Sequence, residues 1–319
     1  TPVSGYPDLR EAVCTKLKRD NNLDYKAENI VTSTGAKQSL ANAILALVDD
    51  NDEVIIPTPY WVTYSELVKI ARGKVVEIKS SPETGFKISA AQLEAAITPK
   101  SKVFLFSSPC NPSGAVYSKA ELEALAEVFR KHPQILIISD EIYEYINFVG
   151  KHESIAQFAD LKDRVIIVNG LSKGFAMTGY RLGYIAASPA IAKACEKLQG
   201  QFTSGTNAVT QKAAVIALTT DLTPTYEMVK EFTRRRKRVL ELVREIPGIK
   251  CFEPEGAFYI FPDVSYYYGK SDAETIVRDS ADFSMYLLNN AHVSSVMGAA
   301  FGDEKCVRFS FANSMNNIE

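Results

Sequence analysis

Three short apolar runs in this sequence, 103–106, 135–138 and 165–168, are each followed by residues that can do chemistry. Runs of this kind are typical of buried strands. In an open parallel sheet, ligands bind outside the carboxyl ends of the strands, so the residues that follow are expected to meet at one edge. They are an amide, a carboxylate, a phenol, an amine and a guanidinium: Asn111, Asp140, Tyr143, Lys173 and Arg181. This set suits a pyridine aldehyde held as a Schiff base.

The amine, Lys173, admits two interpretations. Most lysines are solvated surface residues, but this one follows an apolar run and lies between the small residues Ser172 and Gly174. Desolvation and nearby cations lower the pKa of a lysine and make it a nucleophile. Arg181, eight residues on, is such a cation and is also a candidate ligand for a phosphate.

The carboxylate and the phenol also have two interpretations. Asp140 is either a sheet-end or helix-capping residue, or the partner of a pyridinium nitrogen, whose protonation makes a ring an electron sink. Tyr143 is then placed to hydrogen-bond the phenolic oxygen of the ring. Asn111 precedes a proline and is either a simple turn residue or part of the same site.

A candidate phosphate seat lies at residues 33–37, between a strand pattern and a helix pattern, and includes Gly35, Ala36 and Lys37. The start of a helix offers free N–H groups and the positive end of the dipole. The segment is neither a Walker A loop nor a dinucleotide fingerprint, and a plain turn remains an alternative. Trp61, the single tryptophan, is either a core residue or a stacking partner for a flat ring.

Arg308 lies inside an apolar strand pattern at 307–311. An unpaired buried charge is costly, so this arginine needs an anionic partner. The partner is either a protein carboxylate in a structural ion pair or the carboxylate of a substrate, which a guanidinium binds with two hydrogen bonds.

The composition excludes several classes of protein. The 319 residues carry a net charge of -2, with 46% hydrophobic and 23% charged residues, which gives no global attraction to nucleic acid or membrane. The basic run at 234–238 lies among glutamates and is interpreted as a salt-bridged helix face. Five scattered cysteines indicate reduced thiols in the cytoplasm, and three histidines without ligand spacing predict no metal site. No apolar stretch approaches the ~18 residues of a membrane span.

The order of patterns predicts an α/β fold. As far as residue 222, strand patterns alternate with helical ones, which favours a mostly parallel central sheet with helices on both faces. Beyond it come a long charged helix at about 226–245, a strand region at 256–262, a helix near 272–291 and the strand at 307–311. This order predicts a large domain, 1–222, and a smaller α+β C-terminal domain, 223–319.

Taken together, these residues resemble the fold type I, class I/II family of aminotransferases that use pyridoxal 5′-phosphate (PLP), in particular its prokaryotic aspartate aminotransferases. The resemblance extends from Gly5 to Arg308. It depends on three motifs that are specific as a set: Asn111-Pro112-x-Gly114, Asp140-x-x-Tyr143 and Ser172-Lys173-x7-Arg181.

The resemblance implies a role for each candidate. Lys173 would form the Schiff base with PLP and carry the proton between the substrate Cα and the cofactor C4′. Asp140 would hold the pyridinium proton, Tyr143 and Asn111 would bond the ring oxygen O3′, and Trp61 would stack on the ring.

The remaining roles concern the two anions that the site would bind. The phosphate would be held by Gly35, Ala36, Lys37 and Arg181. The substrate would contact Trp61, Asn111 and Arg308, of which the last two would hold its α-carboxylate.

The sequence departs from the family in places. Gly170 stands where many members have a serine that reaches the phosphate. The tyrosine by which a neighbouring subunit completes the phosphate site precedes the Thr-Pro segment in the family, and here the printed sequence starts at Thr1. No arginine lies between Arg181 and Arg234, where animal-type aspartate enzymes have one for the distal carboxylate. A preference for aspartate is therefore implied by overall similarity alone.

The expected function is a cytoplasmic, homodimeric aminotransferase that exchanges an amino group between an amino acid, aspartate, and 2-oxoglutarate by a ping-pong mechanism. The partners are amino acids and 2-oxo acids, without nucleic acid or membrane. Two alternatives remain: a PLP-dependent lyase or decarboxylase of the same fold, and the PLP-binding domain of a transcription regulator. The side-chain specificity and the physiological pathway stay open.

Overall fold

The computed structural model describes residues 1–272 and 275–319. Its main helices are α1 (Pro7–Asn21), α2 (Ala36–Leu47), α3 (Thr63–Ile70), α4 (Ala90–Ala96), α5 (Lys119–Lys131), α6 (Pro189–Phe202), α7 (Ala208–Thr219), α8 (Thr223–Arg244), α9 (Ser280–Tyr286) and α10 (Met315–Ile318). Its strands are β1 (Ile30–Ser33), β2 (Glu53–Pro57), β3 (Lys74–Ile78), β4 (Ser101–Ser107), β5 (Leu136–Asp140), β6 (Val165–Gly170), β7 (Gly183–Ala186), β8 (Tyr259–Ile260), β9 (Val296–Met297) and β10 (Val307–Ser310).

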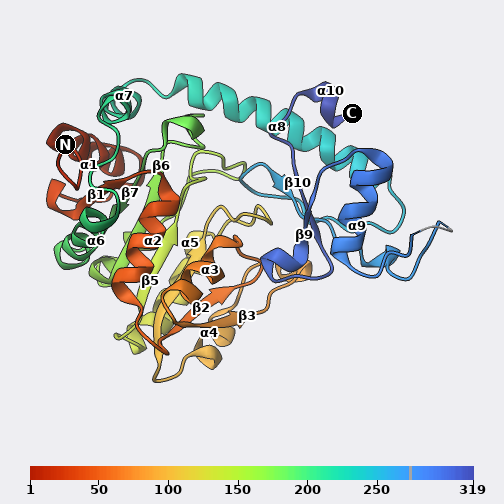
Figure 1. The fold of residues 1–319 in the computed structure, drawn as a ribbon, viewed down its shortest axis with the longest axis horizontal. Coiled ribbons are helices and arrows are strands. Elements are labelled where there is room, and N and C mark those ends of the chain that lie inside the picture. The colour runs from red at the N-terminus through yellow and green to blue at the C-terminus, as the bar shows by residue number, and fades with distance from the viewer. Residues whose placement is uncertain (273–274) are drawn as a thin grey trace.

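A seven-stranded sheet forms the larger part of the molecule, in the order β1-β7-β6-β5-β4-β2-β3 (Figure 1). The strands from β6 through β5, β4 and β2 to β3 pair in parallel, whereas β7 runs antiparallel to both β6 and β1. The sheet is therefore mostly parallel, as predicted. The sequence analysis did not anticipate β7, which is only four residues long and begins with a glycine.

Both faces of this sheet are covered by helices, because side chains alternate between two hydrophobic cores. In β4, Phe104 and Phe106 pack with α1, α4, α5 and α7, whereas Val103 and Leu105 pack with α2, α3 and α6. Strands buried on both faces have almost continuous apolar sequences. This explains why the runs at 103–106, 135–138 and 165–168 were recognisable.

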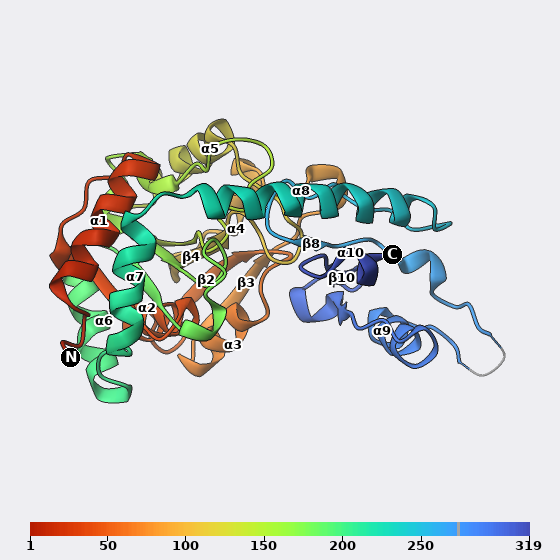
Figure 2. The ribbon, with the colours of Figure 1, turned by 90° about the horizontal axis from the view of Figure 1, so that it is seen from above.

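A three-stranded sheet, β8-β10-β9, lies beside the large one, and α8 extends along both (Figures 1 and 2). A core shared between them packs Phe232 of α8 and Ile260 of β8 against Tyr143 and Ile146, which follow β5. The predicted boundary at residue 222 coincides with the start of α8. The division into domains 1–222 and 223–319 remains a prediction.

The helix expected near 272–291 starts later than predicted. It begins at Ser280, because the Asp279 side chain accepts hydrogen bonds from the N–H groups of Ala281 and Asp282 and so caps the helix. Ahead of it, Ser271 forms a β-bridge with Ile276. Residues 273 and 274 of the predicted helix lie outside the described residues.

The charged face of α8 has the character that the sequence predicts. Arg234 and Arg235 both pair with Glu231, at 2.8 Å, and Arg236 pairs with Glu253, also at 2.8 Å. These arginines are therefore partly neutralised within the protein. Within residues 1–272 and 275–319, no helix has both the length and the apolar composition required to cross a membrane.

Candidate active site

A cavity of about 330 Å³ lies at the carboxyl ends of the parallel strands, where the start of α2 and the small sheet also approach. It is lined by Ala36, Lys37, Trp61, Tyr64, Ser107, Asn111, Asp140, Ile142, Tyr143, Ser172, Lys173, Thr178, Arg181, Tyr259 and Arg308. The structure thus brings together every predicted site residue except Gly35, which lies directly behind Arg181. Their individual roles are still to be tested.

Lys173 follows β6, lines this cavity and is half-buried. Burial lowers its pKa, and the charges of Arg308 and Arg181 lower it further, against the opposing charge of Asp140. Its Nζ lies 5.3 Å from the centre of the Phe258 ring. A lysine in such surroundings is more often in the neutral, nucleophilic form than a surface lysine.

Asp140 is the last residue of β5, and only 3% of it is exposed. Its Oδ2 accepts a hydrogen bond of 2.7 Å from the Tyr64 hydroxyl, and its Oδ1 accepts one of 3.2 Å from the Ile142 amide. Burial raises the pKa of Asp140 to about 6, although both hydrogen bonds oppose the change. A carboxylate held in this way is available for a cationic ligand at the base of the cavity.

Arg308 reaches the cavity from β10 of the small sheet. Its Nη1 donates a 2.8 Å hydrogen bond to Oδ1 of Asn111, and its guanidinium lies 4.5 Å from the Tyr259 ring and 4.8 Å from the Phe301 ring. Within the described part of the chain, Arg308 has no carboxylate as an ion-pair partner. Its charge therefore remains available for the carboxylate of a substrate.

The phosphate seat predicted at residues 33–37 takes shape at the start of α2. Gly35 caps the helix with φ of 85°, and a Cβ there would lie 2.3 Å from Nη2 of Arg181, so only glycine lets the guanidinium approach. Arg181 also has a positive φ, 56°, and its Nη1 donates to the Thr178 carbonyl at 2.9 Å. The first N–H groups of a helix lack acceptors within it, so these groups and Arg181 form a seat for a dianion.

Trp61 and Lys37 line the same cavity. The Lys37 ammonium lies 4.8 Å from the centre of the Trp61 ring, and the ring of Trp61 meets that of Tyr64 edge to face at 5.9 Å. The side chain of Lys37 thus lies over an aromatic face, while its backbone belongs to the first turn of α2.

Comparison with known proteins identifies this arrangement. A profile of the family described as aminotransferase class I and II matches residues 1–319. The chain belongs to this family. It is 44% identical over 323 residues to the aspartate/prephenate aminotransferase of Nitrosomonas europaea, a match that covers 100% of this chain and 81% of the relative. It is 43% identical over 322 residues to the aspartate aminotransferase of Bacillus subtilis, covering 100% and 80%.

A solved structure supports the same assignment. The aspartate aminotransferase of Rhizobium meliloti superposes with a TM-score of 0.97 at 41% identity, over 100% of this chain and 80% of that one. The predicted PLP-dependent transferase fold of type I and the predicted aminotransferase family are therefore confirmed. Aminotransferases of this family use PLP.

The residues present fit that cofactor. The seat for a dianion matches the phosphate of PLP. The half-buried lysine with a lowered pKa matches its aldehyde, and the buried carboxylate that lacks a full counter-charge matches its ring nitrogen. The structure also explains the departure at Gly170. A Cβ there would lie 2.7 Å from the Leu182 carbonyl and 2.8 Å from Cα of Gly183, so the pairing of β6 with β7 leaves no space for a serine.

Sequence reasoning missed several lining residues of this aminotransferase, chiefly Tyr64 and Tyr259. Tyr64 lies three residues after Trp61, and its partner Asp140 is 76 residues away in the sequence. Tyr259 follows Phe258 in an apolar stretch and bonds to Tyr143, 116 residues away. Both are tyrosines inside apolar patterns, a weak signal because a buried hydroxyl needs a partner that the sequence does not reveal.

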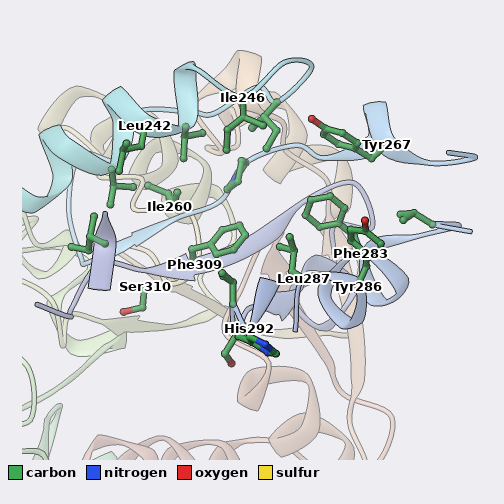
Figure 3. A pocket seen from close by; sticks show the side chains of 18 of the residues that line it. Leu242, Ile246, Ile260, Tyr267, Phe283, Tyr286, Leu287, His292, Phe309 and Ser310 are labelled. Carbon is green, nitrogen blue, oxygen red and sulfur yellow. The ribbon is translucent and has the colours of Figure 1, made fainter. Parts of the chain in front are cut away.

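A larger hollow, of about 1020 Å³, lies in the C-terminal part of the protein. Leu242, Ile246, Ile260, Phe309 and Leu287 are among the apolar side chains around it (Figure 3). Among the described residues, none with a predicted catalytic or binding role lines it. The chemistry is therefore assigned to the smaller, polar cavity.

Proposed function

We propose that the protein transfers the amino group of aspartate to 2-oxoglutarate in two half-reactions at one site. The observation that carries this is a single cavity in which Lys173, with its lowered pKa, meets Asp140 and Arg308. The names of the relatives from Nitrosomonas europaea and Bacillus subtilis support aspartate as the donor. A lyase or a regulatory domain gains no comparable support.

Lys173 is the proposed catalytic base and acid. In its neutral form it takes the proton from the substrate Cα, and as an ammonium it returns the proton at C4′ of the cofactor. Burial and two arginines lower its pKa, so the neutral form is more accessible than in a solvated lysine. When bound, PLP supplies a ring that accepts the electrons left at Cα.

The other cavity residues hold and orient the two ligands. Asp140 keeps the ring nitrogen protonated, Tyr143 and Asn111 donate to the ring oxygen, and Trp61 stacks on the ring. The start of α2 at Gly35, Ala36 and Lys37 holds the phosphate together with Arg181. Arg308 and Asn111, already joined at 2.8 Å, hold the α-carboxylate of the amino acid.

Lys37 is the proposed counter-ion for the distal carboxylate of aspartate. Four cations line the cavity, and Lys173, Arg181 and Arg308 have other roles in this proposal. The Lys37 ammonium lies over the exposed side of the site against Trp61, at 4.8 Å, and has no carboxylate partner in the described part of the chain. A dicarboxylic substrate would supply one.

We also propose a cytoplasmic homodimer. The five cysteines are unpaired thiols, which suits a reducing compartment. Phe202 at the end of α6 and Val209 and Ile216 on α7 are 66%, 77% and 62% exposed. Large exposed apolar side chains suit an interface with a second copy. Sedimentation at micromolar concentration tests this, and an active PLP-loaded monomer would refute it.

The reaction is tested by three measurements on purified protein. Borohydride reduction should attach the cofactor at Lys173, and Lys173→Ala should retain weak PLP binding while losing turnover by about 10²-fold or more. Lys37→Gln should lower kcat/KM for aspartate by about 10-fold or more and change that for alanine little. Cofactor attached at another lysine, or product lacking the 2-oxo acid of the donor, would refute the proposed function.

A further inference from the structure

The two sheets of the protein are joined at the active site by a pair of tyrosines. Tyr143 follows β5 of the large sheet and Tyr259 lies in β8 of the small one, and their hydroxyl oxygens are 2.8 Å apart. Tyr143 is 3% exposed and Tyr259 is 7% exposed. In the described part of the chain, this is the only hydrogen bond that either hydroxyl makes. The two hydroxyls carry one proton each, and the hydrogen bond between them uses one of these protons. The other proton is free to be donated to a ligand.

The charges nearby indicate which tyrosine donates. Burial raises the pKa of both hydroxyls, and Arg308, whose guanidinium lies 4.5 Å from the Tyr259 ring, opposes the rise at both; the charge of Asp140 raises the pKa of Tyr143 further. Burial raises the pKa of Tyr143 well above its ordinary value of 10. The more acidic hydroxyl is the stronger donor, so Tyr259 donates and Tyr143 accepts. The proton of Tyr143 is then free to point into the cavity.

The ring of Tyr259 makes a second contact that matters for the reaction. It lies 4.5 Å from the Arg308 guanidinium, and the Phe301 ring lies 4.8 Å from the same group. The register of the small sheet pairs Tyr259 with Ser310, two residues beyond Arg308 on β10. Contact with two aromatic rings restrains a guanidinium without neutralising its charge.

We propose that Tyr259 is a positioning residue for both ligands of the site. Its hydroxyl directs the Tyr143 proton toward the ring oxygen of the cofactor, and its ring orients Arg308 for the α-carboxylate of the substrate. The inference rests on the proposed function. It links the cofactor side of the site, built on the large sheet, to the substrate side, built on the small one.

The hydroxyl is tested on the PLP-loaded protein by the pH midpoint of the absorption spectrum of the bound cofactor. A donor to the ring oxygen stabilises its unprotonated form, and a chain of hydrogen bonds strengthens that donor. Tyr259→Phe should therefore raise the midpoint by about 0.3–1 pH unit. Tyr143→Phe should raise it at least as much, and the double variant should match Tyr143→Phe alone.

A matched control is available in the same part of the chain. Tyr267 lies in the small-sheet region, and its hydroxyl donates a 2.7 Å hydrogen bond to the Pro247 carbonyl, away from the active site. Tyr267→Phe removes a similar hydrogen bond and should leave the midpoint unchanged. If Tyr267→Phe shifted the pH midpoint as much as Tyr259→Phe, the shift would reflect a general loss of stability, and the proposal would be overturned.

The ring is tested by a second substitution at the same position. Tyr259→Phe keeps the aromatic face, so KM for aspartate and for alanine should stay within about twofold of the wild-type values. Tyr259→Leu removes the face and should raise both KM values by about 3- to 10-fold, with a smaller change in kcat. An equal rise in KM for both variants would overturn the role of the ring.

The outcomes separate this inference from the proposed function. A wild-type protein without coloured cofactor or transamination would overturn the proposed function and this proposal with it. A coloured, active wild type whose midpoint is unchanged by Tyr259→Phe would overturn this proposal alone. The same conclusion would follow if the double variant shifted the midpoint beyond Tyr143→Phe, because the two hydroxyls would then act independently.

Discussion

Two consecutive buried carboxylates at the end of β5, Asp140 and Glu141, have pKa values shifted in opposite directions. They are 3% and 1% exposed. Asp140 accepts its side-chain hydrogen bond from the neutral Tyr64, and burial raises its pKa to about 6. Burial acts on Glu141 in the same direction, yet His152, with Nε2 3.1 Å away, and Lys16 outweigh it and lower the pKa. The charge of the partner, more than the depth of burial, determines the direction.

Around Glu141 the buried carboxylates have basic partners within the protein, and we call this side of the strand end the complete side. Glu144 forms a buried ion pair with Lys16 and accepts a 2.9 Å hydrogen bond from Asn169, so two carboxylates face two cationic groups. Glu141, Glu144 and His152 bring ligand-type atoms within 4.8 Å of one another, and Lys16 and, when protonated, His152 supply the opposite charge. On the other side, Asp140 has no ion pair among the described residues, and the charge of Lys173 lowers its pKa only weakly against burial. We call the Asp140 side the incomplete side, and we expect a cationic ligand to bind there.

The largest effect is predicted on the incomplete side. Asp140→Asn keeps the shape but loses the charge that is proposed to hold the ring nitrogen protonated, so kcat/KM should fall by about 10²-fold or more. Stability of the cofactor-free protein should be unchanged or higher, because a poorly compensated buried charge is removed. Steady-state kinetics and thermal unfolding measure the two effects. Near-normal turnover of Asp140→Asn would show that another group keeps the ring nitrogen protonated.

The complete side should respond in the opposite way. Glu141→Gln leaves His152 buried without its anion and should lower the free energy of unfolding by about 3–5 kcal/mol. The folded fraction should keep a kcat within a few-fold of wild type, because Glu141 does not line the cavity. Chemical denaturation, with activity corrected for folded protein, tests this. If Glu141→Gln lost activity at full stability, the network would belong to the reaction.

The sequence predicted the incomplete side far better than the complete one. Lys173, Asp140 and Asn111 were recognisable because each follows a strand buried on both faces, whose continuous apolar run marks the sheet edge. Glu141 gave no such signal. Its partner His152 lies in a loop, and the more distant Lys16 lies in α1. No periodicity in the sequence connects these residues with Glu141. Pairing across the fold depends on tertiary geometry, which a single sequence does not encode locally.

The same reason accounts for the other differences. The strand β7 is short and stabilised by pairing on both sides, so its sequence carries little strand signal. The helix predicted near 272–291 begins only at Ser280, where Asp279 accepts two amide hydrogen bonds. Gly170 shows the reverse case: its deviation from the family became intelligible only from the close approach of the Leu182 carbonyl.

The pH dependence of stability should differ between the two sides. The pKa of Asp140 is raised from 3.8 to about 6, so in the cofactor-free protein its ionisation lowers stability as pH rises between those values. Wild type should lose up to about 3 kcal/mol relative to Asp140→Asn between pH 4 and pH 7. Unfolding of both proteins at several pH values tests this. Parallel pH profiles would show that Asp140 is not perturbed.

The Glu141–His152 pair carries the opposite sign on the acid side. The pKa of Glu141 is lowered below 4.5, so its contribution to stability is present above that pH and lost on acidification. Glu141 and Glu144 raise the pKa of His152 above 6.5, although burial opposes this, so its contribution is lost as pH rises through the raised value. His152→Gln should remove the alkaline loss, and a retained loss would assign it to another group.

The smallest predicted effect concerns one hydroxyl of the complete side. Ser154 donates a 2.6 Å hydrogen bond to Oε1 of Glu141, and Ser139 donates another, of 3.0 Å, to the same oxygen. Ser154→Ala should lower the free energy of unfolding by about 1 kcal/mol, because Ser139 still satisfies the oxygen. The double variant with Ser139→Ala should cost more than the sum of the two single changes, since the last donor is then lost. Neither variant should change kcat, and a loss of turnover at unchanged stability would remove the distinction between the two carboxylates.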